Sequence, residues 1–260
     1  MTRDMTRYRA IAALLCAAVL AGCEKNAIQE LTAVAPTAGV KFFNFGVNAP
    51  GVNFYANDTK MTAVLSATGT ESVTGTTFSG VGSGGFYSAV TPGSYALSGR
   101  IAAATDKDLA ISTVTTNIVD GKFYSFYMSG FYNTAAKNVE GFVVEDPFPP
   151  TIDYTLAYVR FVNAISNSAP MTMFAKNTTS AVEVPIGGPV AYKSGSAFVG
   201  VPNGVYDLST RVEGSSTNAI SRTAVSLSAG RVYTIGARGD MTVVSTTATN
   251  RPFLDNTLNR

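Results

Sequence analysis

Val159-Arg160-Phe161-Val162-Asn163 is the stretch that decides the fold, because the chain contains its pattern twice. The earlier copy reads Val40-Lys41-Phe42-Phe43-Asn44. In both copies Val and Phe at alternate positions predict a strand with one buried face, with Lys41 or Arg160 on the opposite face. After each copy an Asn and then an Ala-Pro pair are expected to end the strand.

Three further segments recur in the same order. The pairs are Ala49-Pro50 with Ala169-Pro170, Pro92-Gly93-Ser94-Tyr95 with Pro202-Asn203-Gly204-Val205-Tyr206, and Gly121-Lys122-Phe123-Tyr124 with Gly230-Arg231-Val232-Tyr233. A repeat of about 110 residues suits an immunoglobulin-sized domain. The sequence therefore predicts an all-β protein with two tandem immunoglobulin-like antiparallel β-sandwich domains. Gly121 and Gly230 are predicted to lie in hairpin turns.

These segments also resemble a known family. The start at Val159, the Ala169-Pro170 turn, the turn before Tyr206 and the strand after Gly230 are similar to the domain of unknown function 4397 family. The match is clearest over residues 159–239 and weaker over 40–130. The resemblance implies immunoglobulin-like sandwiches of exported bacterial proteins and lipoproteins, often in tandem, and it brings no catalytic residues.

The N-terminus predicts export. Arg3, Arg7 and Arg9 precede a short apolar run that ends in Leu20-Ala21-Gly22-Cys23, as in a signal peptide. This ending resembles the lipobox of bacterial lipoproteins, which implies cleavage before Cys23 and lipidation of its thiol. The alternative is an ordinary secretory signal in which Cys23 falls at that place by chance. By the same resemblance, Glu24 rather than Asp after the anchor favours the outer membrane. The resemblance leaves open whether the protein lies on the periplasmic or the surface-exposed side.

The predicted organisation has five parts. They are a signal peptide (1–22), the lipidated Cys and a flexible tether (23–39), the first sandwich (40–146), a Pro-rich linker (147–154), and the second sandwich with a polar tail (155–260). Three prolines in the linker predict a stiff spacer that holds the two domains apart. Residues 241–244 are predicted to form the last short strand.

Composition excludes several classes of function. Of the 260 residues, 46% are hydrophobic and 14% are charged, and the net charge of +2 falls to zero when residues 1–22 are removed. A neutral chain without a Lys/Arg run argues against nucleic acid as a partner. The chain has no His, and its second Cys, Cys16, lies in the signal peptide. We therefore expect no disulfide, no His-dependent or thiol catalysis, no metal and no cofactor.

Three motifs contain residue types that occur in catalytic or ligand-binding sites. Lys193-Ser194-Gly195 is similar to one element of penicillin-binding proteins, but the Ser-x-x-Lys element is absent from the sequence. Asp106-Lys107-Asp108 could bind calcium or serve as a carboxylate pair, and is interpreted as a solvated hairpin tip. Gly80-Val81-Gly82-Ser83-Gly84-Gly85 lacks the Gly-Lys-Ser/Thr ending of a phosphate loop and is interpreted as a flexible insertion of the first domain.

Aromatic residues distinguish the first copy from the second. Phe43, Tyr55, Phe123 and Tyr127 stand where the second copy has Val162, Ala175, Val232 and Gly236. Either these rings pack on the second domain, the linker or a longer loop, or they form a binding face for a glycan or protein partner. The binding face is our hypothesis from sequence.

The sequence as a whole predicts a non-catalytic, lipid-anchored cell-envelope protein that presents two sandwiches for binding or adhesion, with the membrane as a partner through Cys23. A structural spacer without a specific ligand is the alternative. A carboxylate-dependent glycan hydrolase is the second alternative.

Overall fold

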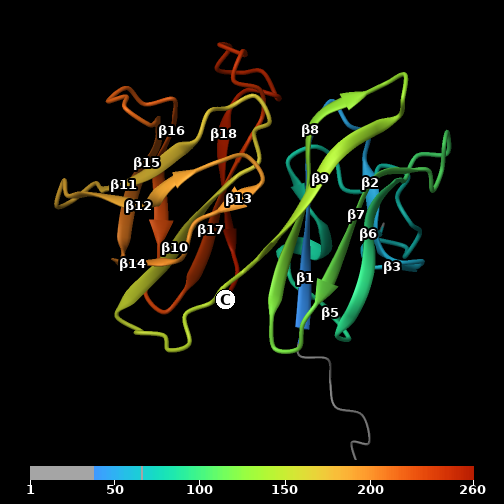
Figure 1. Ribbon diagram of the computed structural model, residues 1–260, viewed down its shortest axis with the longest axis horizontal. Coiled ribbons are helices and arrows are strands. Elements are labelled where there is room, and N and C mark those ends of the chain that lie inside the picture. The colour runs from blue at the N-terminus through green and yellow to red at the C-terminus, as the bar shows by residue number, and fades with distance from the viewer. Residues whose placement is uncertain (1–37, 66) are drawn as a thin grey trace, which may run out of the picture. The chain divides into compact units, whose positions relative to one another are not determined.

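The computed structural model describes residues 38–65 and 67–260 and confirms the all-β prediction (Figure 1). Its described part contains strands β1 to β18 and one short 3₁₀ turn, Gly82–Gly85. No helix in this part is long and apolar enough to cross a membrane. The predicted signal peptide, Cys23 and most of the tether lie outside the described residues.

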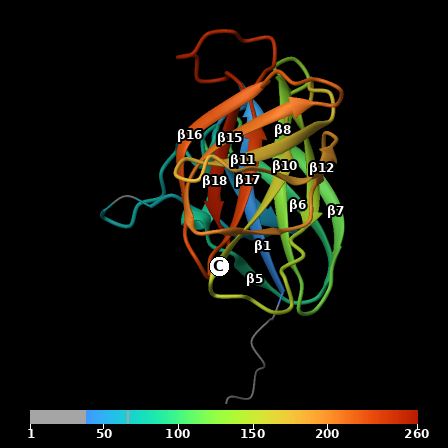
Figure 2. The same ribbon diagram turned by 90° about the vertical axis from the view of Figure 1, so that its left-hand side faces the viewer.

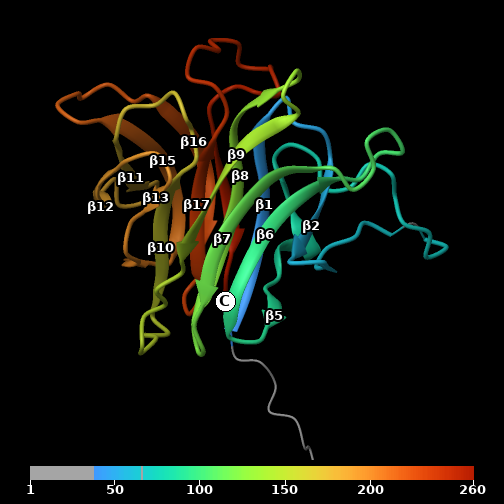
Figure 3. The ribbon, with the colours of Figure 1, turned by 45° about the vertical axis from the view of Figure 1, so that its right-hand side comes forward.

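The first sandwich consists of two sheets. One has the order β4 (Gly80–Val81), β1 (Ala38–Val47), β8 (Phe123–Asn133) and β9 (Asn138–Glu145), and β5 (Ser88–Val90) also pairs with β1. The other has the order β3 (Thr59–Lys60), β2 (Val52–Ala56), β6 (Gly93–Ile101) and β7 (Ala110–Ile118). Figure 3 brings this sandwich forward and shows β6 and β7 side by side.

The second sandwich repeats these pairings strand for strand. Its sheets run β13 (Ser194–Gly195), β10 (Leu156–Asn163), β17 (Val232–Arg238), β18 (Phe253–Leu258), and β12 (Glu183–Val190), β11 (Met171–Asn177), β15 (Gly204–Val212), β16 (Ile220–Leu227). The remaining strand, β14 (Val199–Pro202), pairs with β10 as β5 pairs with β1. The identical pairing order agrees with the duplication inferred from the sequence.

Each sandwich also contains a parallel pair, which the antiparallel prediction missed. β1 runs parallel to β8, and β10 runs parallel to β17. Gly121 and Gly230 therefore do not close hairpins, because β7 and β16 pair within one sheet while β8 and β17 belong to the other. Both glycines have positive φ angles, 73° and 72°, which is why the two sheet-to-sheet turns need this residue.

The inward faces of the strands form one core in each sandwich. In the first, Phe42 stacks on Phe54 at 5.2 Å between ring centroids and meets the edge of Phe126 at 6.3 Å. The predicted core face of β8 is confirmed, since Tyr124, Phe126 and Met128 are all buried there. The turn tyrosines close each core at its rim: Tyr95 Oη donates to the Thr91 carbonyl (2.9 Å) and Tyr206 Oη to that of Pro202 (2.6 Å).

The prediction that the linker holds the sandwiches apart is wrong. The outward faces of the β1 and β10 sheets share a third apolar cluster, made of Phe43, Phe45, Tyr127, Phe142, Val162 and Ala164. A Cβ added to Gly236 on β17 would lie 2.9 Å from the Phe45 ring, so the absence of a side chain there admits that ring. The central strands of these two facing sheets, β1, β8, β10 and β17, are thus largely buried on both faces.

The last strand also differs from the prediction. Residues 241–244 form a turn and irregular structure, whereas Phe253–Leu258 forms β18 and pairs antiparallel with β17. From sequence this strand is interpreted as part of a polar tail because of its polar residues. Only Leu254 of this strand is fully buried. The rest of its stability comes from the backbone ladder and from side-chain contacts at the junction.

Arg160 is buried at this junction rather than exposed. Its guanidinium forms an ion pair with Asp146, which follows β9 of the first sandwich, and donates to the Glu145 carbonyl (2.8 Å) and Thr234 Oγ1 (3.0 Å). Asp146 also accepts from Tyr87 Oη (2.5 Å) and Ser125 Oγ (2.8 Å). Both charges are therefore desolvated and fully partnered.

Lys41 makes the reciprocal contact. It occupies the position of Arg160 in the first copy, and its Nζ donates to the Leu258 carbonyl and to Asn259 Oδ1, both at 2.9 Å. The residues after β9 and β18 therefore receive the cation of the other sandwich. This exchange gives the two copies an interface like that of a two-fold dimer.

Replacing Arg160 with Met should lower the free energy of unfolding by about 3–5 kcal/mol, because Asp146 would stay buried without its cation. Arg211→Met is the matched control: its ion pair with Glu183 is partly exposed, so its loss should cost less than about 1 kcal/mol. Urea unfolding curves measure both values. The double variant Arg160→Met/Asp146→Leu should regain part of the lost stability. Equal losses of stability in Arg160→Met and Arg211→Met would contradict a stabilising role of the buried ion pair.

Candidate functional site

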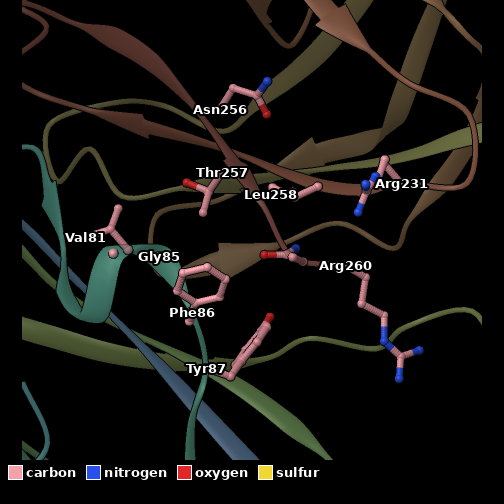
Figure 4. Close-up of a pocket in the computed structure, with 11 residues that line it drawn as sticks. Val81, Gly85, Phe86, Tyr87, Arg231, Asn256, Thr257, Leu258 and Arg260 are labelled. Atoms are coloured by element: carbon pink, nitrogen blue, oxygen red, sulfur yellow. The ribbon is translucent and has the colours of Figure 1, made fainter.

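A cleft opens along the junction of the two sandwiches (Figure 4). Its volume is about 450 Å³. One wall comes from residues 81–87 of the first sandwich, and the other from the turn before β17 and from the end of the chain after Asp255. Segments far apart in the sequence therefore build the cleft where the two sandwiches meet.

The Gly-rich segment forms the first wall. Gly80 and Val81 pair with Asn44 and Phe43 of β1, and the chain then makes the 3₁₀ turn Gly82–Gly85, where Ser83 and Gly84 have left-handed backbone angles. A strand, β5, follows this turn, so the segment does not have the loop-to-helix geometry of a phosphate loop. Instead the turn presents Phe86, which is 76% exposed.

The second wall is polar and basic. Arg231, Asn256 and Arg260 line it, and Figure 4 shows them opposite Phe86 and Tyr87. Asn256 Oδ1 is buried without a hydrogen-bond partner among the described residues. No Asp or Glu occurs among the residues that line the cleft, all of which belong to the described part of the chain.

Lys41 contacts two residues that line the cleft: its Nζ is 4.4 Å from the centroid of the Tyr87 ring and donates to the Leu258 carbonyl. Burial lowers the pKa of Lys41 to about 8, and Asp146 only partly offsets this effect. Burial also raises the pKa of Tyr87, reinforced by the charge of Asp146 and the hydrogen bond to it. Tyr87 therefore remains a neutral hydrogen-bond donor, and Lys41 is the side chain here whose charge changes in mildly alkaline solution.

The structure does not support an external binding face for Phe43 and Tyr127. Their rings stack at 4.3 Å, and both are buried in the cluster between the sandwiches. The binding-face hypothesis is therefore wrong for these two residues, because the second sandwich covers them. The alternative that they pack on the second domain describes them correctly.

Phe123 and Tyr55 have other neighbours. Phe123 packs against Tyr87 at 5.0 Å and against Phe148 of the linker at 5.3 Å, beside the junction. Tyr55 is buried under Arg100, whose Cζ lies 4.3 Å from the ring centroid, and its hydroxyl donates to Asp108 (2.8 Å). Burial, with the hydrogen bond to Asp108, raises the pKa of Tyr55.

The strand register corrects the sequence match of Tyr55. Arg100 pairs opposite Asn53 and its counterpart Arg211 opposite Thr172, which places Tyr55 over Phe174 rather than Ala175. Arg211 covers Phe174 at 4.2 Å, as Arg100 covers Tyr55. Both copies therefore have an aromatic residue at this position, and Tyr55 is not an additional aromatic of the first copy.

The other candidate motifs are already engaged. Asp106 forms an ion pair with Lys137 (2.7 Å) and Asp108 accepts from Tyr55, so the hairpin tip holds its two carboxylates in separate contacts. Lys193 pairs with Glu140 at 2.5 Å, and Ser194 pairs with Asn163 in the sheet. Among the described residues no group of three or more His, Cys, Asp or Glu side chains lies together.

Sequence reasoning missed Tyr87. The pairing of Ser88 with Val40 and of Val199 with Val159 makes Tyr87 the counterpart of Phe198. Arg160 covers Phe198 at 5.1 Å as Lys41 covers Tyr87. Counting back one residue from Ser88 and Val199 identifies this pair, which the Gly-rich insertion before Tyr87 conceals in the sequence.

One family matches this chain by sequence. Residues 157–258, which span the second sandwich from β10 to β18, match the family described as a domain of unknown function (DUF4397). No curated protein matches the chain.

The Lys41 pKa predicts a pH dependence of stability. From pH 8 upward the folded protein loses this proton, while the unfolded chain keeps it until about pH 10.5, so the unfolded state binds more protons and stability rises with pH. Between pH 7 and 9.5 the gain should be about 2 kcal/mol. Urea unfolding over this range measures it.

Lys41→Met is the control and should lack the rise. Above pH 10 stability should fall in both proteins, because the raised pKa values of Tyr87 and Tyr127 mean that the unfolded state deprotonates first. Identical slopes for the two proteins below pH 9.5 would show that Lys41 is not the titrating group.

Proposed function

Since the second sandwich is a DUF4397 domain and the first repeats its strand pairings, we propose that this chain is a non-catalytic cell-envelope protein that binds a glycan in the junction cleft. A lipid on Cys23 anchors it, with the outer membrane as the favoured site. The two sandwiches act as one binding unit, not as independent modules.

The exposed Phe86 ring is the observation that carries this proposal. Phe86 is 76% exposed and lines the cleft, so its ring is accessible to a ligand that enters there. The ring offers an apolar face, while Arg231 and Asn256 offer hydrogen-bonding groups on the opposite wall. An apolar surface with a few polar groups around it suits a sugar, which has a hydrophobic ring face and a rim of hydroxyls.

The rigid junction supports a second candidate, the structural spacer. The buried ion pair and the apolar cluster would keep the two sandwiches in one orientation without any ligand. The two candidates differ in one measurable property, because a spacer has no saturable ligand.

The double variant Phe86→Ala/Arg231→Gln should reduce glycan affinity at least tenfold, since it removes the ring and a donor from opposite walls. A printed array of bacterial surface glycans finds the ligand, and calorimetry on the purified glycan measures the affinity. Phe131→Ala is the matched control, because Phe131 is also an exposed phenyl ring, at 45%, but lies on β8 outside the cleft lining. Saturable binding that survives the double variant contradicts the cleft assignment, and absence of saturable binding favours the spacer.

Mass spectrometry of the native protein should find a chain that begins at Cys23 and carries a diacylglyceryl group. Cys23→Ser should release the protein from the membrane fraction, because the thioether to the lipid cannot form. Intact residues 1–22, or an unmodified Cys23, would refute the anchor while leaving the cleft proposal testable.

A further inference from the structure

The second sandwich has an irregular loop that the first sandwich lacks. In the first copy the β8–β9 hairpin remains paired up to Asn133 and Asn138. In the second copy the pairing of β17 with β18 stops at Arg238 and Phe253, and residues 239–252 form a loop that stands beyond the ends of the strands (Figure 2). Loops that diverge on a common scaffold are where binding sites arise.

This loop and β16 enclose a groove of about 800 Å³. Its polar lining consists of Ser221, Arg222, Thr223, Ser245, Thr246 and Arg251. No carboxylate occurs among its lining residues, all of which the structure describes. The groove is therefore cationic and rich in hydroxyl donors.

Three guanidinium groups surround the ring of Phe253 in the groove wall. The Cζ atoms of Arg222, Arg238 and Arg251 lie 5.3, 5.1 and 5.2 Å from the ring centroid. Arg238 is neutralised by an ion pair with Asp255. In contrast, Arg222 donates to the Leu254 carbonyl (2.6 Å) and Arg251 to that of Ala248 (2.9 Å), and neither forms an ion pair within the described chain.

Hydrogen bonds hold the loop in position. Asn167 Nδ2 donates to Asp240 Oδ1 (2.7 Å), and its Oδ1 accepts from the Met241 amide (3.2 Å). The Asp240 amide donates to the Asn250 carbonyl (2.9 Å), which closes the base of the loop beside Arg251. Arg251 is therefore placed before a ligand arrives, so little ordering entropy opposes binding.

We propose that this groove is a second binding site, which takes an oxyanion, the phosphate or carboxylate group of a charged glycan. Planar guanidinium groups match both anions, and here those of Arg222 and Arg251 keep unused donors while contact with the Phe253 ring restricts their positions. Ser221, Thr223, Ser245 and Thr246 can donate to the remaining anion oxygens and to sugar hydroxyls. The site rests on residues that the junction cleft does not use.

Calorimetry at low salt with two probes, glucose 1-phosphate and trigalacturonate, tests the site. We expect saturable binding of at least one of the two probes and no binding of neutral maltotriose. Comparison of the two affinities shows whether the groove prefers phosphate or carboxylate. Arg222→Gln/Arg251→Gln should weaken binding at least tenfold, and added salt should weaken it as well. Arg211→Gln, which removes an arginine that lines neither the groove nor the junction cleft, should leave it unchanged.

A second variant distinguishes loss of anion contacts from loss of packing around Phe253, which the arginine substitutions could also cause. Thr246→Glu places a carboxylate in the groove without removing either arginine, and should weaken anion binding at least tenfold while the thermal unfolding temperature stays within a few degrees. Absence of saturable binding of both probes, or equal affinity of the wild type and both groove variants, overturns the proposal. Failure of the junction cleft would instead appear as loss of the Phe86-dependent glycan binding, which these probes and variants do not measure.

Discussion

The buried contact between Arg160 and Asp146 is the constraint on which the rest of the structure depends. A guanidinium and a carboxylate that have left water are tolerable only while each keeps its partners, and those partners come from different sandwiches. Either sandwich without the other would expose the third apolar cluster and lose the ion pair of Arg160 with Asp146. Docking of the two repeats is therefore a condition of the native state, and the cleft at the junction follows from it.

The interface also explains why the copies have diverged. Each sandwich sends a cation to the end of the last strand of the other, as the two halves of a symmetric dimer would. The apolar part is asymmetric: Phe43 and Tyr127 in the first copy face a sheet in which Val162 and Gly236 occupy the equivalent positions. The large rings of the first sandwich need small residues on the facing sheet of the second, because a close-packed interface has no room for two identical aromatic faces.

Much of the fold could be predicted from local pattern. Alternation along 159–163 and its copy identified strands and their core faces, and the recurrent Tyr95 and Tyr206 turns identified the repeat. The candidate site could not be predicted in the same way. The two-residue alternation of a strand predicts that Lys41 and Arg160 lie on the face opposite the core. It does not predict whether water or another sheet covers that face. The Gly-rich insertion likewise changes the spacing between the copies, which conceals the equivalence of Tyr87 and Phe198.

The sequence by itself determined an all-β chain, its duplication and the residues of the two inner cores, because these depend on short-range periodicity and on turn residues with restricted φ angles. Only the tertiary structure decided that the outer faces meet, that β1 and β10 pair in parallel with β8 and β17, and that residues 253–258 form a strand. Those features depend on contacts between residues that are far apart in the sequence, or on burial that a polar pattern conceals. The cleft beside Phe86 and the groove around Phe253 belong to this second group, since each is assembled from segments that only the folded chain brings together.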